Sequence, residues 1–446
     1  QGASMPSRRG SRSVLLVRWR TVSSSIRSPC RRSLRFASSA RPEVFLRDYH
    51  EVDQTMHRLH CGHPWVFDRE IGNISMLGVH PPGTLVELSG PQREPLGVGY
   101  LNRSSSVTVR RFAPPQTVDP VQVLRSRLVD RLKAAKADGS VRVVAGEGDG
   151  IPGVFLDSFG DTAVVRFDTL GSAVLLEAVI KEELAAHFPH ARVLVHRMRA
   201  RKEKQASGGS EYQSYAAVGD SGEFTVTECG VKIAVNHDLG VRASWDPTGE
   251  VPRGVVARFA RGKSVLDVNC GYGEWGLRCA AAGASEVVMM EQSVGQAQLA
   301  TRNAADSARS EVCTVLQRSS VLDEMKIMAQ SRVQFDVVVL KLPLQTAYKK
   351  SVYHGQFGKY FKPDNSGFEK LCKRAGELVA RGGILAVNIT VPAEAAYNAI
   401  NVIRVGLAWM DRRSSCVWES AGDGSRRILT HVDLSYPRTV VLRMHS

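Results

Sequence analysis

Hydrophobic and polar residues alternate with a period of two in an early part of the chain. Residues 83–88 (Gly-Thr-Leu-Val-Glu-Leu) and 106–112 (Ser-Val-Thr-Val-Arg-Arg-Phe) follow this pattern, which is typical of strands with one buried face. Between them, Gly97 and Gly99 stand where a small barrel must bend sharply. We therefore expect a compact β-barrel within residues 42–115.

The next part of the chain changes to a helical period. Val121, Leu124, Leu128 and Leu132 lie on one face of a helix that we expect from Asp119 to about residue 136. Asp119 is a suitable N-cap, and the proline after it suits the first helical position. A strand, a Gly/Pro-rich turn and a second strand follow, then a helix, a strand and a polar hairpin tip, within residues 142–157, 174–187, 191–196 and 197–213. We interpret residues 116–228 as a small α+β middle domain.

Strands and helices alternate in the remaining part, residues 229–446. Apolar or β-branched runs separated by helical segments predict a mostly parallel sheet that is covered on both faces. The expected strands are residues 264–268, 286–290, 313–317, 335–340 and 383–388, with a last one at 438–444.

The charge is unevenly distributed. The net charge is +15, but ten arginines lie within residues 1–42, which contain no lysine and no acidic residue, so the rest of the chain carries only +5. That mild excess fits an RNA partner without requiring one. The eight cysteines form no Cys-x-x-Cys pair, so we expect neither a metal site nor a disulfide framework. No apolar run is long enough to cross a bilayer.

The first forty residues have the composition of a targeting signal. Residues 14–19 are mostly apolar and lie among arginines and serines, as in the cationic amphipathic helix of a mitochondrial transit peptide. We therefore predict that residues 1–41 are a transit peptide or disordered, and that the protein acts in the mitochondrial matrix. A disordered basic tail that binds nucleic acid is the alternative.

A glycine-rich segment carries the clearest chemical signal. Residues 265–276 (Val-Leu-Asp-Val-Asn-Cys-Gly-Tyr-Gly-Glu-Trp-Gly) read as a buried strand that enters a glycine turn and then a helix. Eighteen residues past Gly273, the next strand ends in Glu291, whose carboxylate could accept hydrogen bonds from a ribose diol. This spacing suits dinucleotide sites and S-adenosylmethionine (SAM) sites alike, and Asp267 ahead of the glycines favours SAM.

Three further motifs support a family resemblance. They are residues 62–67 (Gly-His-Pro-Trp-Val-Phe), then Gly97-x-Gly99-Tyr100-x-Asn102 with Arg110, and residues 146–153 (Gly-Glu-Gly-Asp-Gly-Ile-Pro-Gly) with Asp157. In this order, from about His50 to the C-terminus, the chain resembles the bacterial large-subunit rRNA methyltransferases of the RlmI type. The resemblance implies an α/β chain with an N-terminal PUA-like RNA-binding barrel, a small α+β middle domain and a C-terminal class I (Rossmann-like) methyltransferase domain. It also implies 5-methylcytosine as the product.

The resemblance, together with charge, suggests binding residues. For the cofactor SAM the candidates are Asp267, Asn269, Cys270, Gly271, Gly273, Glu291 and Ser320. Ser320 stands where the family has an aspartate that contacts adenine. For RNA the candidates are Trp65, Arg110, Arg111, Lys202 and Lys204, although the last two could equally belong to a solvated loop.

The catalytic pattern of the family is interrupted. Methylation of cytosine C5 requires a thiolate that attacks C6, and the resemblance places the family's cysteines at Asn388 and Thr390. The family's Asp-Pro-Pro appears here as Lys341-Leu342-Pro343. Cys270 and Cys372 are not obvious substitutes, because one belongs to the glycine turn and the other to an expected helix.

Two functions remain open from the sequence. The first is a catalytically degenerate RNA-binding protein in mitochondrial ribosome assembly or structure, with mitochondrial rRNA and ribosomal or assembly proteins as partners. The second is an active SAM-dependent rRNA methyltransferase with atypical catalytic residues. A small-molecule methyltransferase is a weaker third hypothesis, because the barrel is of an RNA-binding kind.

Overall fold

The structure is a computed structural model. It describes residues 41–48, 52–105, 107–135, 140–207, 212–240, 244–342, 365–390, 414–419 and 437–444. The predicted transit peptide therefore lies outside the described residues, except for Arg41. Among the residues that are described, no helix combines the length and the apolar character that crossing a bilayer requires.

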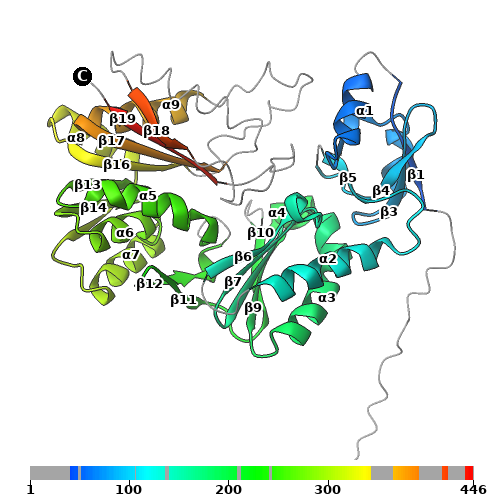
Figure 1. Ribbon diagram of the computed structural model, residues 1–446, viewed down its shortest axis with the longest axis horizontal. Coiled ribbons are helices and arrows are strands. Elements are labelled where there is room, and N and C mark those ends of the chain that lie inside the picture. The colour runs from blue at the N-terminus through cyan, green and yellow to red at the C-terminus, as the bar shows by residue number, and fades with distance from the viewer. Residues whose placement is uncertain are drawn as a thin grey trace, which may run out of the picture. The chain divides into compact units, whose positions relative to one another are not determined.

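The N-terminal region forms the predicted β-structure, a five-stranded sheet in the order β1-β3-β4-β5-β2. Four of these strands, β1, β3, β4 and β5, are labelled in Figure 1. Close approach of β4 to β5 depends on glycine, because a Cβ at Gly97 or Gly99 would lie 2.6 Å from a backbone oxygen of β5. The elements are β1 (Glu43–Phe45), α1 (Val52–His60), β2 (Trp65–Phe67), η1 (Asp68–Glu70), η2 (Ile74–Val79), β3 (Leu85–Ser89), β4 (Pro95–Leu101) and β5 (Val107–Ala113).

The middle region is an α+β unit with a second five-stranded sheet, in the order β10-β9-β8-β7-β6. Its first helix begins as predicted, since the Asp119 side chain accepts a hydrogen bond from the Gln122 N–H at 3.0 Å. The predicted hairpin tip is partly helical, because α4 lies between β9 and β10. The elements are α2 (Pro120–Ala134), β6 (Ser140–Ala145), η3 (Gly146–Asp149), β7 (Val154–Phe159), β8 (Thr162–Phe167), α3 (Leu170–His187), β9 (Arg192–Met198), α4 (Arg201–Ala206) and β10 (Tyr212–Val218).

A short antiparallel hairpin leads into the last region. It consists of β11 (Glu223–Glu228) and β12 (Val231–Asn236), followed by η4 (His237–Leu239), η6 (Pro247–Gly249) and α5 (Glu250–Ala260). The remaining elements are β13 (Ser264–Val268), α6 (Glu274–Ala281), β14 (Glu286–Glu291), α7 (Val294–Asp306), β15 (Cys313–Gln317), α8 (Val321–Gln330), β16 (Phe335–Leu342), α9 (Asn365–Leu378), β17 (Val379–Thr390), β18 (Ser414–Glu419) and β19 (Pro437–Met444).

The last region is built on a seven-stranded sheet in the order β15-β14-β13-β16-β17-β19-β18. Strands β13 to β17 pair in parallel, whereas β19 runs antiparallel to both of its neighbours. Helices α5, α6 and α7 lie on one face of the sheet, and α8 and α9 lie on the other (Figure 1). Neighbouring residues of β13 point to opposite faces, so Val265 packs with residues of the first group of helices and Leu266 with residues of the second. The prediction of a mostly parallel sheet covered on both faces is confirmed.

The strand order identifies where a ligand would bind. From β13 the chain proceeds to β14 and β15 on one side, and then returns to β16 and β17 on the other. The carboxyl ends of β13 and β16 therefore form a topological switch point, the usual ligand position in open α/β sheets.

Candidate functional site at the switch point

The glycine turn after β13 has the backbone that its sequence predicts. Asn269, Gly271 and Gly273 have φ values of 58°, 62° and 85°, in the left-handed region. The Asn269 side-chain N–H donates to the backbone oxygen of Lys341 at 2.8 Å, which ties the end of β13 to the end of β16. The turn and β16 are thus held together at the switch point.

Glu291 ends β14 beside this turn, as its spacing predicted. Its Oε2 accepts from the Gly271 N–H at 2.9 Å, and its Oε1 accepts from the Gln292 and Ser293 N–H groups at 2.8 and 2.9 Å. The carboxylate is fixed in place by three backbone donors. Much of its capacity to accept hydrogen bonds is therefore already used.

Asp267 is fully buried in β13. Its Oδ2 accepts from the Gly276 N–H at 2.8 Å, while its Oδ1 has no hydrogen-bond partner. Burial, followed by the nearby negative charge of Glu274, raises the pKa of Asp267 to about 7. This carboxyl group is therefore partly protonated near neutral pH.

Lys341 turns toward the glycine turn and forms an ion pair with Glu274, the first residue of α6. The Glu274 side chain is 8% exposed and also accepts from the Tyr272 N–H at 3.2 Å. A methyl group placed on Gly271 would lie 3.2 Å from the Lys341 Nζ, so the ammonium group covers the turn.

The Lys341 ammonium group remains charged in this setting. Burial alone would lower the pKa of Lys341, but attraction to Glu274, and then to Asp267 and Glu291, outweighs burial and raises that pKa. The sequence left the direction of this side chain open. The structure places it in the switch point.

One of the two positions that the resemblance assigns to the family's cysteines lies next to Lys341. Asn388 is 8% exposed and stands opposite Lys341 in the β16–β17 register. Thr390 ends β17, but its side chain is outside the described part of the structure, as is Pro343. The position compared with the family's acid and one of the two positions compared with its cysteines are therefore adjacent, occupied by Lys341 and Asn388.

The two nearby cysteines are poor replacements for the missing nucleophile. Cys270 is fully buried, and burial followed by the surrounding carboxylates raises the pKa of its thiol well above the ordinary value. A thiol in that state is a weak nucleophile. Cys372 is also fully buried, within α9.

Two further residues near the glycine turn are Ser320, which was a predicted cofactor contact, and Gly276, which was not. Ser320 is the N-cap of α8, where its hydroxyl oxygen accepts from the Asp323 N–H at 3.2 Å. Gly276 was not among the predicted site residues, yet it completes a Gly-x-Gly-x-x-Gly spacing with Gly271 and Gly273. A Cβ at Gly276 would lie 2.7 Å from Met289, so this glycine lets α6 pack closely on the sheet.

Three carboxyl groups surround the glycine turn, against one ammonium group, that of Lys341, among the residues described there. Glu274 is paired with Lys341, and Glu291 is held by backbone donors. The unpartnered Oδ1 of Asp267 belongs to a carboxyl group whose pKa is near 7. Lys341 therefore neutralises part of the negative charge that would face the sulfonium and ammonium groups of SAM.

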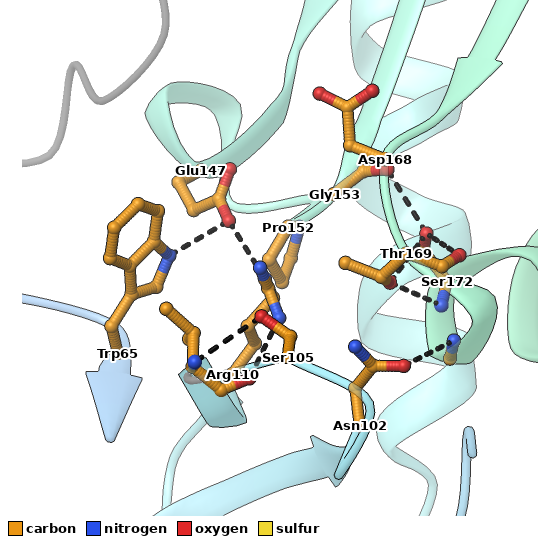
Figure 2. Close-up of polar contacts among 12 residues, drawn as sticks. Trp65, Asn102, Ser105, Arg110, Glu147, Pro152, Gly153, Asp168, Thr169 and Ser172 are labelled. Atoms are coloured by element: carbon orange, nitrogen blue, oxygen red, sulfur yellow. Dashed lines mark hydrogen bonds and ion pairs between the residues drawn. The ribbon is translucent and has the colours of Figure 1, made fainter. Parts of the chain in front are cut away.

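The predicted RNA-binding residues of the barrel bind the chain itself. The Trp65 indole N–H donates to the Glu147 Oε1 at 2.9 Å, and the Arg110 Nε donates to the same oxygen at 3.3 Å (Figure 2). Arg111 donates to the backbone oxygens of Leu96 and Leu59 at 3.0 and 2.6 Å. These donors are engaged within the protein, so their role toward RNA stays a prediction.

The second predicted group lies on α4. Lys202 is exposed there, and the Lys204 side chain is outside the described part of the structure. Among the predicted RNA contacts whose side chains are described, Lys202 has an exposed ammonium group.

The most specific motif of the sequence, residues 146–153, joins the barrel to the middle region. The Tyr100 hydroxyl donates to the Pro152 oxygen at 3.0 Å, and the Asn102 side-chain oxygen accepts from the Gly171 N–H at 3.2 Å. The Ser172 hydroxyl donates to the Gly153 oxygen at 3.0 Å (Figure 2). The motif therefore has a structural role as well as a diagnostic one.

Comparison with known proteins agrees with this architecture. A model of the PUA-like domain matches residues 54–114. The chain is 26% identical over 332 residues to the ribosomal RNA large subunit methyltransferase I of Shewanella denitrificans, covering 72% of this chain and 80% of that protein. It is 25% identical over 352 residues to the protein of the same name from Shewanella amazonensis, covering 76% and 86%.

Solved structures show the same fold. A protein from Streptococcus mutans described as a SAM-dependent methyltransferase superposes with a TM-score of 0.69 at 14% identity, covering 90% of this chain and all of that one. A methyltransferase solved in complex with S-adenosylhomocysteine also gives 0.69, at 13% identity, covering 90% and 99%. The α/β fold with a PUA-like domain and a class I methyltransferase domain is thus confirmed.

Proposed function

We propose that this chain, a homologue of the RlmI-type large-subunit rRNA methyltransferases, is an RNA-binding protein of mitochondrial ribosome assembly or structure that no longer transfers a methyl group. The observation that carries the proposal is that Lys341 and Asn388 are neighbours in the register of β16 and β17, near the carboxyl ends of these strands. By the resemblance, Lys341 replaces the family's acid, and Asn388 and Thr390 replace its two cysteines. These positions lie toward the carboxyl ends of β16 and β17.

The chemistry of cytosine C5 methylation supports the loss of activity. The reaction needs a thiolate that adds to C6, and neither the amide of Asn388 nor the hydroxyl of Thr390 supplies one. Cys270 cannot take over, because its thiol is buried and its pKa is raised well above the ordinary value. Lys341 brings a positive charge to a position where the family has a carboxylate.

The RNA partner is supported by the PUA-like domain and by the names of the homologous proteins. Exposed Lys202 on α4 could neutralise a phosphate. The mitochondrial setting rests on the arginine-rich, acid-free composition of residues 1–42.

Binding of the full chain to mitochondrial rRNA tests the proposal. We expect salt-dependent binding at physiological ionic strength, co-sedimentation with mitochondrial ribosomal particles, and no transfer of labelled methyl from SAM. Log affinity falls as log salt concentration rises, and replacing Lys202 with glutamate should make this dependence shallower, reducing the magnitude of the slope by about 1. Lys232→Glu, at an exposed position on β12, is the matched control and should leave the slope unchanged.

Two measurements, RNA binding and association with ribosomal particles, can contradict the proposal. If the protein neither binds RNA nor associates with ribosomal particles, the proposal is wrong. If the two lysine variants change the slope of the salt dependence equally, α4 is not a specific contact site for the RNA.

The alternative is an active SAM-dependent rRNA methyltransferase with atypical catalytic residues. It is favoured by the preserved left-handed turn at Gly271 and Gly273 and by Glu291 at the end of β14. Transfer of labelled methyl to rRNA by the wild-type protein, lost in Gly273→Arg, would support this alternative. Unchanged rRNA modification after depletion of the protein would count against it.

A further inference from the structure

We infer that the barrel contacts unpaired RNA through an exposed surface on η2 and the loop between β4 and β5, formed by Met76, Gly78, Val79 and Arg103. Arg103 binds a backbone phosphate there, and Met76 and Val79 pack against the faces of unpaired bases. We call these four residues the η2 surface. The inference rests on the proposed RNA-binding function, and it concerns residues that the sequence did not single out.

Two apolar side chains project from η2 into solvent. Met76 is 71% exposed and Val79 is 83% exposed, whereas Leu77 is 2% exposed and belongs to the core of the barrel. Residues three apart lie on the same face of a 3-10 helix, so Met76 and Val79 are neighbours on the surface. The short helix therefore has one face in the core and an apolar face that is open to a partner.

A guanidinium group lies beside this apolar face. Arg103 is exposed, and its Nη1 lies 2.8 Å from the place that a Cβ on Gly78 would occupy. Within the part of the chain that the structure describes, no hydrogen bond or ion pair engages the Arg103 side chain. Arg110 and Arg111, by contrast, donate to other groups of the protein. Arg103 therefore keeps its donors for a ligand.

The charge of the surrounding segments favours an anionic partner. Residues 71–86 and 95–118, which contain the η2 surface, include three arginines and a histidine but no acidic residue. Arginine contacts to phosphates supply much of the affinity for RNA and position it. Unpaired bases offer faces that apolar side chains can cover, whereas a duplex hides these faces by stacking. Single-stranded RNA therefore fits the η2 surface better than a duplex does.

The test compares variants of the η2 surface in the full chain, with mitochondrial rRNA as the probe. Arg103→Gln should reduce the magnitude of the slope of log affinity against log salt by about 1, because one phosphate contact is lost. The double variant Met76→Ser, Val79→Ser should lower the affinity roughly fivefold with an unchanged slope, because it removes apolar contact and no charge. Ultraviolet irradiation, which crosslinks bases to side chains that touch them, should attach RNA to a peptide that spans η2.

Helix α5 supplies matched controls for both kinds of side chain. Val251 is 58% exposed there, and Arg258 is exposed as well. Val251→Ser and Arg258→Gln should leave both the affinity and the slope unchanged. Thermal unfolding of each variant checks that it is folded.

Three outcomes overturn the inference. If the wild-type protein binds RNA and the η2 variants behave like the α5 controls, the inference is wrong and the proposed function stands. The absence of RNA binding by the wild-type protein contradicts both. If the η2 variants keep their affinity for rRNA but lose association with ribosomal particles, the η2 surface binds a protein instead.

Discussion

The Trp65 indole N–H and the Glu147 carboxylate form a hydrogen bond of 2.9 Å between residues that are 82 positions apart. Trp65 comes from the first signature motif of the barrel, and Glu147 comes from the motif of the middle region. Arg110, from the remaining signature, donates to the same carboxylate oxygen at 3.3 Å. Residues from the three motifs thus meet at one carboxylate that joins two regions of the chain.

The first prediction concerns this carboxylate. Glu147 and Arg110 have side chains that are 8% and 9% exposed, so Glu147→Gln would leave a nearly buried guanidinium group without its charged partner. We expect the free energy of unfolding to fall by about 3 kcal/mol. Denaturant unfolding, monitored by tryptophan fluorescence and by circular dichroism, measures the change.

Glu182→Gln is the control for this change. Glu182 also pairs with an arginine, Arg125, but its side chain is 64% exposed, so the variant should lose less than about 1 kcal/mol. Equal losses for the two variants would show that burial of the Glu147–Arg110 pair is not what makes it matter.

The second prediction concerns Gly153, which has a φ of 75°. A Cβ there would lie 2.8 Å from the Tyr100 hydroxyl oxygen and 3.1 Å from the Ser172 hydroxyl oxygen. Gly153→Ala should therefore combine backbone strain with a steric clash against the Tyr100 and Ser172 side chains. Gly160 has a similar φ of 65° but open space around it, so Gly160→Ala isolates the backbone term of about 1 kcal/mol.

The measurement is the difference between the two alanine variants. We expect Gly153→Ala to be less stable than Gly160→Ala by a further ~1–3 kcal/mol, from overpacking. Similar melting temperatures for the two variants would mean that the Tyr100 and Ser172 side chains can move aside freely.

Local patterns were sufficient to predict the turn at the switch point. The strand before Asn269, the glycines and the acid at Glu291 all follow from spacing within about 25 residues, and the structure brings them together. Buried parallel strands are also visible locally, as continuous apolar runs.

Long-range partners could not be predicted in this way. The direction of Lys341 depends on Glu274, which lies 67 positions earlier in the chain. Arg110 has the charge of an RNA contact, but its partner Glu147 belongs to a different region, and charge alone does not reveal such a pair. In both cases the outcome depends on which oppositely charged side chain the fold brings close. The periodicity of apolar residues in the sequence carries no information about such distant partners.

The third prediction concerns the pH dependence of stability through Asp267. Its pKa is raised from 3.8 to about 7 in the folded protein, so between these values the folded state holds a proton that the unfolded state has released. Stability from this group is therefore fully present below pH 4 and is lost as the pH rises through about 7. Asp267→Asn removes the titration and should stabilise the protein increasingly as the pH rises.

The expected size follows from the shift. Between pH 5 and pH 8, the stability of Asp267→Asn relative to wild type should increase by about 2.5 kcal/mol. Urea unfolding of both proteins at the two pH values measures it. A relative stability that does not change with pH would show that Asp267 is ionised in the folded protein at pH 5.

The last prediction concerns two stacked histidines. The rings of His196 and His237 lie 4.1 Å apart between centroids, and both residues are buried. Burial, and then the proximity of His237, lowers the pKa of His196 well below 6.5, and burial lowers the pKa of His237 as well. The unfolded chain therefore takes up protons first as the pH falls below about 6.5, and the folded state loses stability there.

We expect His237→Gln, which keeps a polar side chain but cannot titrate, to lose less stability than wild type between pH 7.5 and pH 5. His60→Gln, at an exposed position on α1, should follow the wild-type profile. If His237→Gln also follows it, protonation of the stacked pair does not contribute to acid sensitivity.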